Sequence, residues 1–215
     1  MSDPSRKAIA ERSVGTATKN TDLVRDRRDQ IVKAAIRVFA AKGFHETTVR
    51  DIGREAQLTQ GTLYNYVRSK EDILFLVCDR IVTGYLERVR AAAAIEGDAR
   101  ERLEAAVKGV VRVMCAHKDS ILLLYHESHN LEPKSLRVIL SRVDEFIVSF
   151  EGLLRDAGIV AAREQKQLRL MANIATFLPT MVALRKWALP GALGEEATID
   201  EIAAFILRGL QVTSV

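Results

Sequence analysis

The stretch TVRDIGREAQLTQGTLYNY, residues 48–66, is the most informative part of this sequence about its fold. Thr48 stands three residues before Asp51, which is the spacing of a capping box at the start of a helix. Thr59 is a second N-cap candidate about two helical turns later, so the first helix must be short. The stretch therefore predicts two short helices joined by a tight turn, an arrangement known as a helix-turn-helix.

The start of the second of these helices, residues 59–62 (TQGT), carries the chemistry that DNA recognition requires. In a helix-turn-helix this end of the helix enters the major groove, so its side chains must be short or able to hydrogen-bond to base edges. Gln60 and Thr62 are predicted to contact bases, and Gly61 to let the backbone approach closely. The alternative is that Gln60 and Thr62 are polar residues that only face solvent.

Two tyrosines and a lysine follow at positions where DNA phosphates would run. Tyr64 and Lys70 are expected to hold phosphate, Lys70 together with the N-terminus of the helix that it opens. For Tyr64 and Tyr66 the alternative is packing between helices, and one of the two is expected to pack. The full set of predicted DNA contacts is Arg27, Thr48, Arg50, Thr59, Gln60, Gly61, Thr62, Tyr64, Asn65, Tyr66 and Lys70.

The residues around this motif predict an all-α fold. Apolar residues at helical spacing predict a first helix over about 22–42, which Gly43 ends so that Phe44 folds back on its last turn. Ser69 is expected to cap a long fourth helix that reaches about residue 95. Further helices are predicted over about 98–117, 119–128, 133–158, 161–189 and 198–210.

Two features near the end of the chain carry separate expectations. Pro179 lies inside the predicted helix over 161–189, where it removes a backbone hydrogen bond and is expected either to kink the helix or to curve it around the core. Thr198 and Glu201 have the spacing of a capping box and are expected to open the last helix.

Charge is distributed unevenly along the chain. Residues 1–70 carry fourteen Lys and Arg against eight Asp and Glu, a net charge of +6, whereas residues 71–215 carry eighteen against twenty, a net charge of −2. A basic first third fits a nucleic-acid-binding head on a different body. We therefore expect a disordered leader over 1–21, a helix-turn-helix DNA-binding domain over 22–68, and a helical ligand-binding and dimerisation domain over 69–215.

The sequence lacks the features of several classes of protein. No apolar run approaches the roughly 18 residues that a membrane span needs, and residues 1–20 lack the apolar segment of a signal peptide, so a cytoplasmic location without a membrane partner is expected. Cys78 and Cys115 are expected to be buried thiols rather than a disulfide or a metal pair. With no nucleophile–base pair, phosphate-cradling glycine loop or metal-ligand spacing, no enzyme activity, catalytic residue, metal or cofactor is predicted.

Residues 31–73, IVKAAIRVFAAKGFHETTVRDIGREAQLTQGTLYNYVRSKEDI, resemble the DNA-binding domain of the tetracycline-repressor (TetR) family. The resemblance implies the architecture of that family: helices four to seven around a ligand pocket, and helices eight and nine forming a four-helix dimer interface. The expected fold is therefore a three-helix DNA-binding domain plus a six-helix ligand-binding and dimerisation domain. The positions that match in order and spacing are Phe39, Gly43, Phe44, Thr47, Thr48, Val49, Ile52, Gly61, Thr62, Leu63, Tyr64, Tyr66, Lys70 and Glu71.

Three residues depart from the pattern of the family. Gly53 stands where alanine is usual, which should loosen the second helix by about 1 kcal/mol. Gln57 replaces the usual turn glycine, so the turn must place a residue with a side chain in a left-handed backbone conformation. Val67 replaces the usual aromatic residue. None of the three removes a group that is expected to face DNA.

Candidates for a ligand site lie in the second half of the chain, at Tyr125, His126, His129 and Phe177. His126 and His129 are one helical turn apart, which invites a metal site, but no Glu is followed three residues later by His, as a di-iron helical bundle would need. The alternative is a helix end whose imidazoles face water. Trp187 loosely resembles the C-terminal region of the acyl-CoA-responsive branch of the family; its alternative is a tryptophan that fills a dimer seam.

Together these features predict a transcriptional regulator, in the first place a repressor. It is expected to bind a pseudo-palindromic operator in double-stranded DNA as a homodimer formed through the last two helices. A small-molecule effector, apolar or acyl in nature, is expected to release it. The alternatives are a DNA-binding protein without a sensor and, from another class, a helical enzyme.

Overall fold

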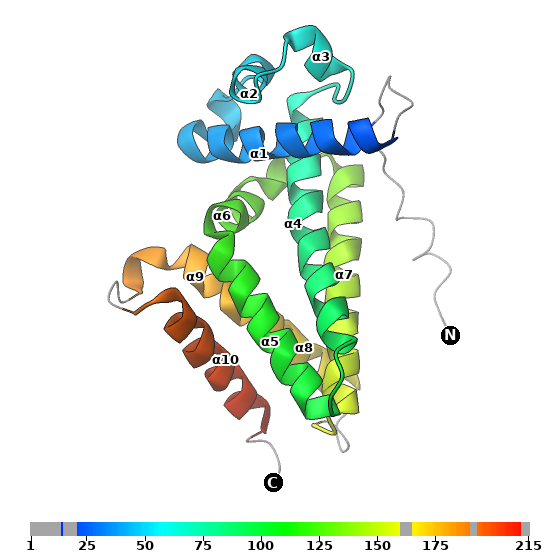
Figure 1. The fold of residues 1–215 in the computed structure, drawn as a ribbon, viewed down its shortest axis with the longest axis vertical. Coiled ribbons are helices and arrows are strands. Elements are labelled where there is room, and N and C mark those ends of the chain that lie inside the picture. Colours follow the sequence, from blue (N-terminus) through cyan, green and yellow to red (C-terminus); the bar gives the residue numbers. More distant parts are fainter. Residues whose placement is uncertain (1–13, 15–20, 160–164, 190–192, 212–215) are drawn as a thin grey trace. The chain divides into compact units, whose positions relative to one another are not determined.

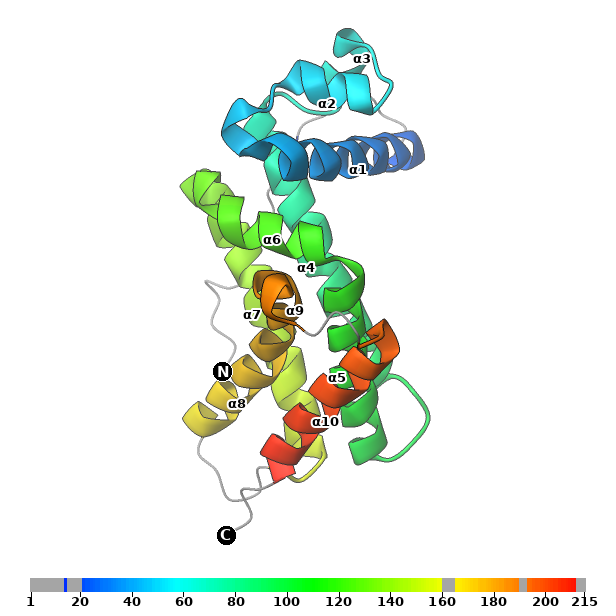
Figure 2. The same ribbon diagram turned by 90° about the vertical axis from the view of Figure 1, so that its left-hand side faces the viewer.

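The computed structural model describes Val14 and residues 21–159, 165–189 and 193–211, and every regular element in these parts of the chain is helical (Figures 1 and 2). When α8, η3 and α9 are counted as one interrupted helix, the described parts contain the expected nine. The elements are α1 (Thr21–Glu46), α2 (Val49–Glu55), α3 (Gln60–Tyr64), α4 (Lys70–Ala93), α5 (Ala99–Ala116), α6 (Lys118–Glu127), η2 (Ser128–Asn130), α7 (Pro133–Asp156), α8 (Gln165–Phe177), η3 (Leu178–Thr180), α9 (Met181–Leu184), η4 (Lys186–Ala188) and α10 (Glu195–Gln211).

The chain divides into two compact units. The first consists of Met1–Val82 and Leu122–Ser141, and the second of Thr83–Ile121 and Arg142–Val215. Both α4 and α7 therefore contribute residues to each unit. Of the predicted leader, only Val14 and Thr21 are described; residues 1–13 and 15–20 lie outside the described part of the chain. Among the described helices, none is long and apolar enough to cross a membrane.

In the first unit, α1 supplies the buried face that the sequence predicted. Ile31 and Phe39 are almost fully buried, and Gly43 adopts a non-helical, left-handed φ of 77° that interrupts the helix. Phe44 then folds back, with its ring centroid 5.5 Å from that of Phe39. Gly43 therefore ends the regular part of α1, as predicted, and its permissive backbone is what allows Phe44 to pack.

Local capping interactions fix the ends of the next helices. Thr48 and Asp51 form the predicted capping box at the start of α2, and Thr59 caps α3. The hydroxyl of Ser69 accepts a hydrogen bond from the backbone N–H of Asp72 at 3.1 Å, which caps α4 as predicted. Each cap gives a partner to an N–H group that the helix itself leaves unpaired.

In the second unit, α5 packs side by side with α10. Asp98 and Glu101 form a capping box at the start of α5. Val110 and Val111 of α5 and Ile199 and Ala203 of α10 are buried. The core of this unit is thus built from apolar faces at helical spacing.

The predicted helix over 161–189 is wrong in its continuity. Its described part forms α8, which ends at Phe177, followed by η3, α9 and η4. Pro179 lies in η3, where it has no N–H to donate and its ring is incompatible with an α-helical turn, so the chain tightens into a 3-10 turn. Residues 161–164 lie outside the described part of the chain.

The predicted start of the last helix is also wrong, because α10 begins at Glu195 rather than at Thr198. Thr198 lies within the first turn, and its hydroxyl donates to the carbonyl of Gly194 at 3.0 Å. A hydroxyl that bonds backwards in this way is a helix-interior contact and not an N-cap. The predicted capping box with Glu201 is therefore replaced by a helix that starts one turn earlier.

Candidate nucleic-acid interface

The turn between α2 and α3 has the hydrogen bonds of a Schellman motif. The N–H of Gln57 donates to the carbonyl of Arg54 at 3.1 Å, and the N–H of Leu58 donates to the carbonyl of Gly53 at 2.9 Å. This motif places one residue in the left-handed region, and Gln57 does so with a φ of 55°. A left-handed backbone is the conformation predicted for Gln57, and among the described residues no other non-glycine residue has a positive φ.

Gly53 lies where α2 packs on α3. A Cβ atom on Gly53 would stand 3.4 Å from the carbonyl oxygen of Leu58 and 3.5 Å from Cδ1 of Leu63. These are ordinary van der Waals distances, and Leu63 is fully buried. The position therefore has room for the alanine that is usual there, and the glycine weakens α2 without serving a close contact.

The first turn of α3 is held by its two threonines. The Thr59 hydroxyl accepts from the N–H of Thr62 at 3.2 Å, and the two hydroxyl oxygens lie 2.8 Å apart. One hydroxyl thus donates to the other, which leaves the pair fewer free hydrogen-bonding positions than two isolated threonines. Gln60 and Gly61 are exposed beside them.

Gly61 differs from Gly53 in its surroundings. A Cβ atom on Gly61 would meet no heavy atom of the described chain within 4 Å, and the backbone there has no positive φ. Neither the local conformation nor packing within the described protein therefore requires glycine at this position. Glycine at position 61 therefore lowers the stability of α3 relative to alanine and makes no compensating contact within the described protein.

The two tyrosines of the motif have different environments. Tyr64 is 46% exposed, whereas Tyr66 is 5% exposed and belongs to the core. One tyrosine was expected to pack, and it is Tyr66, so its ring does not face outward with Tyr64. Asn65 between them is exposed and is the C-cap of α3.

Lys70 makes contacts within the protein that the sequence pattern does not predict. Its ammonium donates to the carbonyl of Phe44 at 2.7 Å and to that of His45 at 3.0 Å, and it lies 4.4 Å from the centroid of the Phe44 ring. An ammonium has three N–H donors, so two are engaged at the end of α1. Lys70 therefore fastens the start of α4 to the end of α1, whatever its third donor binds.

The remaining predicted DNA contacts are spread over α1 and α2. Arg50 is exposed, and the guanidinium of Arg27 donates to the side-chain oxygen of Gln30 at 2.8 Å. The hydroxyl of Thr48 is engaged with Asp51 at 2.8 Å. Hydrogen bonds from Thr48, aided by Lys42, lower the pKa of Asp51 to about 2.

Gln30 also contacts the turn of the helix-turn-helix. Its amide nitrogen donates to the carbonyl of Ala56 at 2.6 Å, across 26 residues of sequence. Arg28, next but one, donates to the carbonyl of Tyr66 at 3.5 Å and to that of Val14. Nothing in the sequence pattern of α1 distinguishes these two side chains, because their partners are backbone groups that any residue would provide.

The predicted ligand residues are exposed in the structure. Tyr125 and His126 lie at the end of α6 and His129 lies in η2, all in the first unit, whereas Phe177 ends α8 in the second. Tyr125 is 44% and Phe177 55% exposed. No group of three or more His, Cys, Asp or Glu that could hold a metal ion occurs among the described residues.

Both cysteines are buried free thiols, as predicted. Burial raises the pKa of the Cys78 thiol to about 12, and burial likewise raises that of Cys115. Both shifts disfavour the thiolate, which is the nucleophilic form of cysteine.

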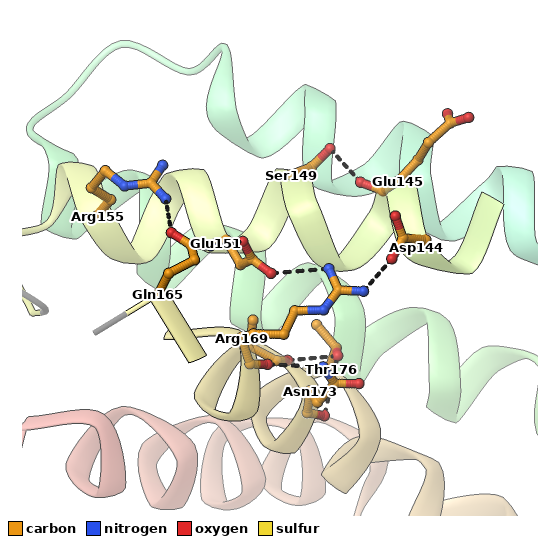
Figure 3. Close-up of polar contacts among 10 residues, drawn as sticks. Asp144, Glu145, Ser149, Glu151, Arg155, Gln165, Arg169, Asn173 and Thr176 are labelled. Carbon is orange, nitrogen blue, oxygen red and sulfur yellow. Dashed lines mark hydrogen bonds and ion pairs between the residues drawn. The ribbon is translucent and has the colours of Figure 1, made fainter. Parts of the chain in front are cut away.

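In the second unit a polar cluster joins α7 to α8 (Figure 3). Arg169 of α8 donates to Glu151 at 2.9 Å and to Asp144, both on α7. Gln165 donates to the second oxygen of Glu151 at 2.8 Å and accepts from Arg155 at 3.3 Å. The carboxylate of Glu151 is thus buried with both oxygens satisfied, and the cluster fixes how α8 lies on α7.

An apolar stripe lies on the outward side of α8. Leu170, Ile174 and Phe177 have helical spacing and are 61%, 56% and 55% exposed. The buried stripe of the same helix, which includes Leu168 and Ala172, is offset by two residues, or about 200° around the axis. The helix is therefore apolar on two opposite sides, of which the rest of the described chain covers one.

Two stretches of the chain match known protein families. Residues 31–77 match the family described as "Bacterial regulatory proteins, tetR family", and residues 96–210 match "Tetracyclin repressor-like, C-terminal domain". The second match alone spans more than half of the 215 residues.

Individual relatives agree with this assignment. The chain is 35% identical over 121 residues to the HTH-type transcriptional regulator HbdR of Aromatoleum sp. (strain CIB), covering 55% of the chain and only 52% of HbdR. It is 27% identical over 193 residues to the HTH-type transcriptional repressor KstR2 of Rhodococcus jostii (strain RHA1), covering 86% of the chain and 91% of KstR2.

A solved structure shows the same fold. That structure is of AibR in complex with isovaleryl coenzyme A and operator DNA; the TM-score is 0.68 at 19% identity, over 83% of this chain and 97% of AibR. The matched family and the curated relatives are regulators of transcription and not enzymes. This chain belongs to the TetR family of bacterial regulatory proteins.

Proposed function

We propose that this regulator is a homodimeric repressor that binds a pseudo-palindromic operator and is released by a small-molecule effector. The observation that carries the proposal is the exposed start of α3, where Gly61 has no structural need to be glycine. A partner that approaches the backbone closely explains such a glycine, and the major-groove edge of DNA is the partner that a helix-turn-helix presents itself to.

Within this interface the side chains divide by chemistry. Gln60, which is exposed, and Thr62, which is half-buried, contact bases from the start of α3, while the exposed phenol of Tyr64 contacts phosphate. The third donor of Lys70 contributes a phosphate contact. Arg27, Arg50 and Asn65 extend the phosphate contacts at the edges, and Thr48 and Thr59 contribute through the helix starts that they cap.

A second copy of this chain covers the outward stripe of α8. Leu170, Ile174 and Phe177 form a continuous apolar surface, and Phe205 of α10 is 63% exposed. Exposed apolar side chains at regular helical spacing are typical of helix–helix interfaces. Because a dimer of this kind presents two identical heads, its operator is a pair of inverted half-sites.

The effector is an apolar or acyl compound bound in the second half of the chain. AibR, which has the same fold, was solved with isovaleryl coenzyme A and operator DNA together. Tyr125, His126 and His129, on α6 and η2 of the first unit, remain candidate contacts, whereas Phe177 belongs to the outward stripe of α8. By preferring a conformation that fits the operator poorly, the effector would shift the population away from the DNA-bound form.

Selection from a random DNA pool tests the DNA part of the proposal. Wild-type protein is expected to enrich an inverted repeat and to bind it ~10³-fold more tightly than a random duplex of the same length and salt concentration. Adding acyl-CoA thioesters of increasing chain length should lower this affinity for at least one of them. Equal binding of every sequence would instead favour a DNA-binding protein without operator specificity.

Sedimentation tests the dimer. Ile174→Lys places a charge in the outward stripe of α8 and is expected to yield monomers. Ile95→Lys is the matched control, because Ile95 is also an exposed isoleucine, 40% exposed, but lies outside that stripe. Dimers that persist in Ile174→Lys at micromolar concentration would contradict the proposed interface.

A further inference from the structure

The turn of the helix-turn-helix contains an unusual combination of strain and support. Gln57 occupies the left-handed position of the Schellman motif, where the Cβ atom crowds the following carbonyl oxygen and strains the backbone. The carbonyl of the preceding residue, Ala56, belongs to the peptide group whose orientation is set by ψ of Ala56 and φ of Gln57. Any group that holds this carbonyl therefore holds the strained conformation as well.

Gln30 of α1 is that group. Its amide nitrogen donates to the Ala56 carbonyl at 2.6 Å. Its amide oxygen accepts from the guanidinium of Arg27 at 2.8 Å, which keeps the nitrogen directed at Ala56. Ala56 as a residue is 3% exposed and the hydrogen bond to its carbonyl is partly buried, so loss of the donor leaves an acceptor with restricted access to water.

We infer that Gln30 is a positioning residue for DNA recognition, because it holds the Ala56–Gln57 peptide in the conformation that aims α3. It substitutes for the glycine that would otherwise relieve the turn. The inference rests on the proposed DNA contact of α3. It adds that a side chain of α1, remote from the bases, controls the register of Gln60 and Thr62 on DNA.

A double-mutant cycle tests this role. Gln30→Met keeps the length, the neutral charge and the helix propensity of the side chain but removes the donor. Gln57→Gly removes the strain that the donor is inferred to hold. The full-length protein is assayed with two DNA probes: a duplex that the wild type selects from a random pool, and a random duplex of equal length.

We expect Gln30→Met to bind the selected duplex about tenfold more weakly, the size of one lost, partly buried hydrogen bond. Its binding of the random duplex should stay within about twofold of wild type. When Gln57 is already replaced by glycine, Gln30→Met should lower the affinity for the selected duplex by less than about threefold. If Gln57→Gly restores the binding of the Gln30→Met variant to the selected duplex, Gln30 acts by positioning the turn. A general loss of stability would instead weaken binding to both duplexes and would persist with either glutamine or glycine at position 57.

Arg37→Lys is the matched control. Arg37 also joins α1 to α2, through a 2.6 Å contact with Glu55, but it does not touch the turn, and lysine keeps its charge. Binding of the selected duplex by this variant should stay within about twofold of wild type. Wild-type selectivity in Gln30→Met, or an undiminished loss in the Gln57→Gly background, would overturn the inference.

The proposed DNA contact can fail separately. If the wild type selects no duplex, the proposed function is refuted, and thermal unfolding of the same four proteins still measures the coupling between Gln30 and Gln57. A smaller drop in melting temperature for Gln30→Met in the glycine background supports the positioning of the turn. Equal drops in the two backgrounds refute it.

Discussion

Replacing Gly61 by alanine separates the stability of the α3 start from its fit to DNA. Most changes in a DNA-binding helix alter both at once. At Gly61 a Cβ atom meets no described heavy atom within 4 Å, so the protein itself accommodates the methyl group. Gly53→Ala is the matched control, because it adds the same methyl group one helix earlier, against Leu58 and Leu63 and away from the exposed side.

Both substitutions should stabilise the fold. Alanine is favoured over glycine in a helix by about 0.5–1 kcal/mol. For a chain of this size that gain raises the melting temperature by about 1–4 °C. Gly53→Ala should lie at the upper end, because it also fills an ordinary contact distance between α2 and α3, and Gly61→Ala at the lower end, because it lies in the first turn of a five-residue helix.

Only Gly61→Ala should weaken DNA binding. A methyl group forced into a close-packed contact typically costs about 1–3 kcal/mol, which corresponds to roughly 5- to 150-fold in affinity. Gel-shift titration of the selected duplex and differential scanning calorimetry measure the two quantities on the same samples. If Gly61→Ala binds the selected duplex as tightly as Gly53→Ala does, the start of α3 does not approach DNA as proposed.

Four further outcomes follow from individual contacts. Gln57→Gly should raise the free energy of unfolding by about 0.5–1 kcal/mol in urea titrations, because relief of the left-handed strain exceeds the extra entropy of unfolded glycine; a decrease would contradict this. Lys70→Met should lower the melting temperature by a few degrees, since two carbonyls at the end of α1 lose their donor; an unchanged temperature would show that these bonds contribute nothing. The pKa of Asp51 is lowered from 3.8 to about 2, so the ionised carboxylate stabilises the fold fully above about pH 4 and loses this effect toward pH 2. The difference in melting temperature between wild type and Asp51→Asn should therefore shrink from pH 4 to pH 2. A difference that stays constant over this range would contradict the stabilising role of the carboxylate. Cys78, with its pKa raised to about 12, should resist a thiol reagent at pH 8 until the protein unfolds, and rapid labelling of the native protein would contradict its burial.

Interactions that are local in sequence were predictable from the residues alone. The caps at Thr48, Thr59 and Ser69 and the interruption at Gly43 involve partners at most four residues away. The strain at Gln57 was predictable only through the family resemblance, because Gln57 stands where the family usually has its turn glycine.

Errors in the prediction arose where two local signals competed. Pro179 was assigned to a continuous helix, although the chain has a tighter turn available at that point and takes it as η3. Thr198 looked like an N-cap, but the three residues before it, beginning at Glu195, also form helix, and the hydroxyl then bonds backwards. Acidic residues in a first turn favour helix as strongly as a single threonine does, so this choice depends on tertiary packing of α10 against α5.

Side chains that donate to backbone carbonyls far away in the sequence could not be predicted. In the first unit, these side chains all hold the short helices or the ends of their neighbours in place. α2 and α3 have seven and five residues, which is too short for a helix to persist in water by itself. The turn after α2 and the residues after α3 expose carbonyls that need donors, and α1 supplies them through Gln30 and Arg28. Lys70 of α4 in turn donates to carbonyls at the end of α1. Because these donors come from long helices with their own buried faces, the orientation of the residues proposed to face DNA depends on contacts made within the protein.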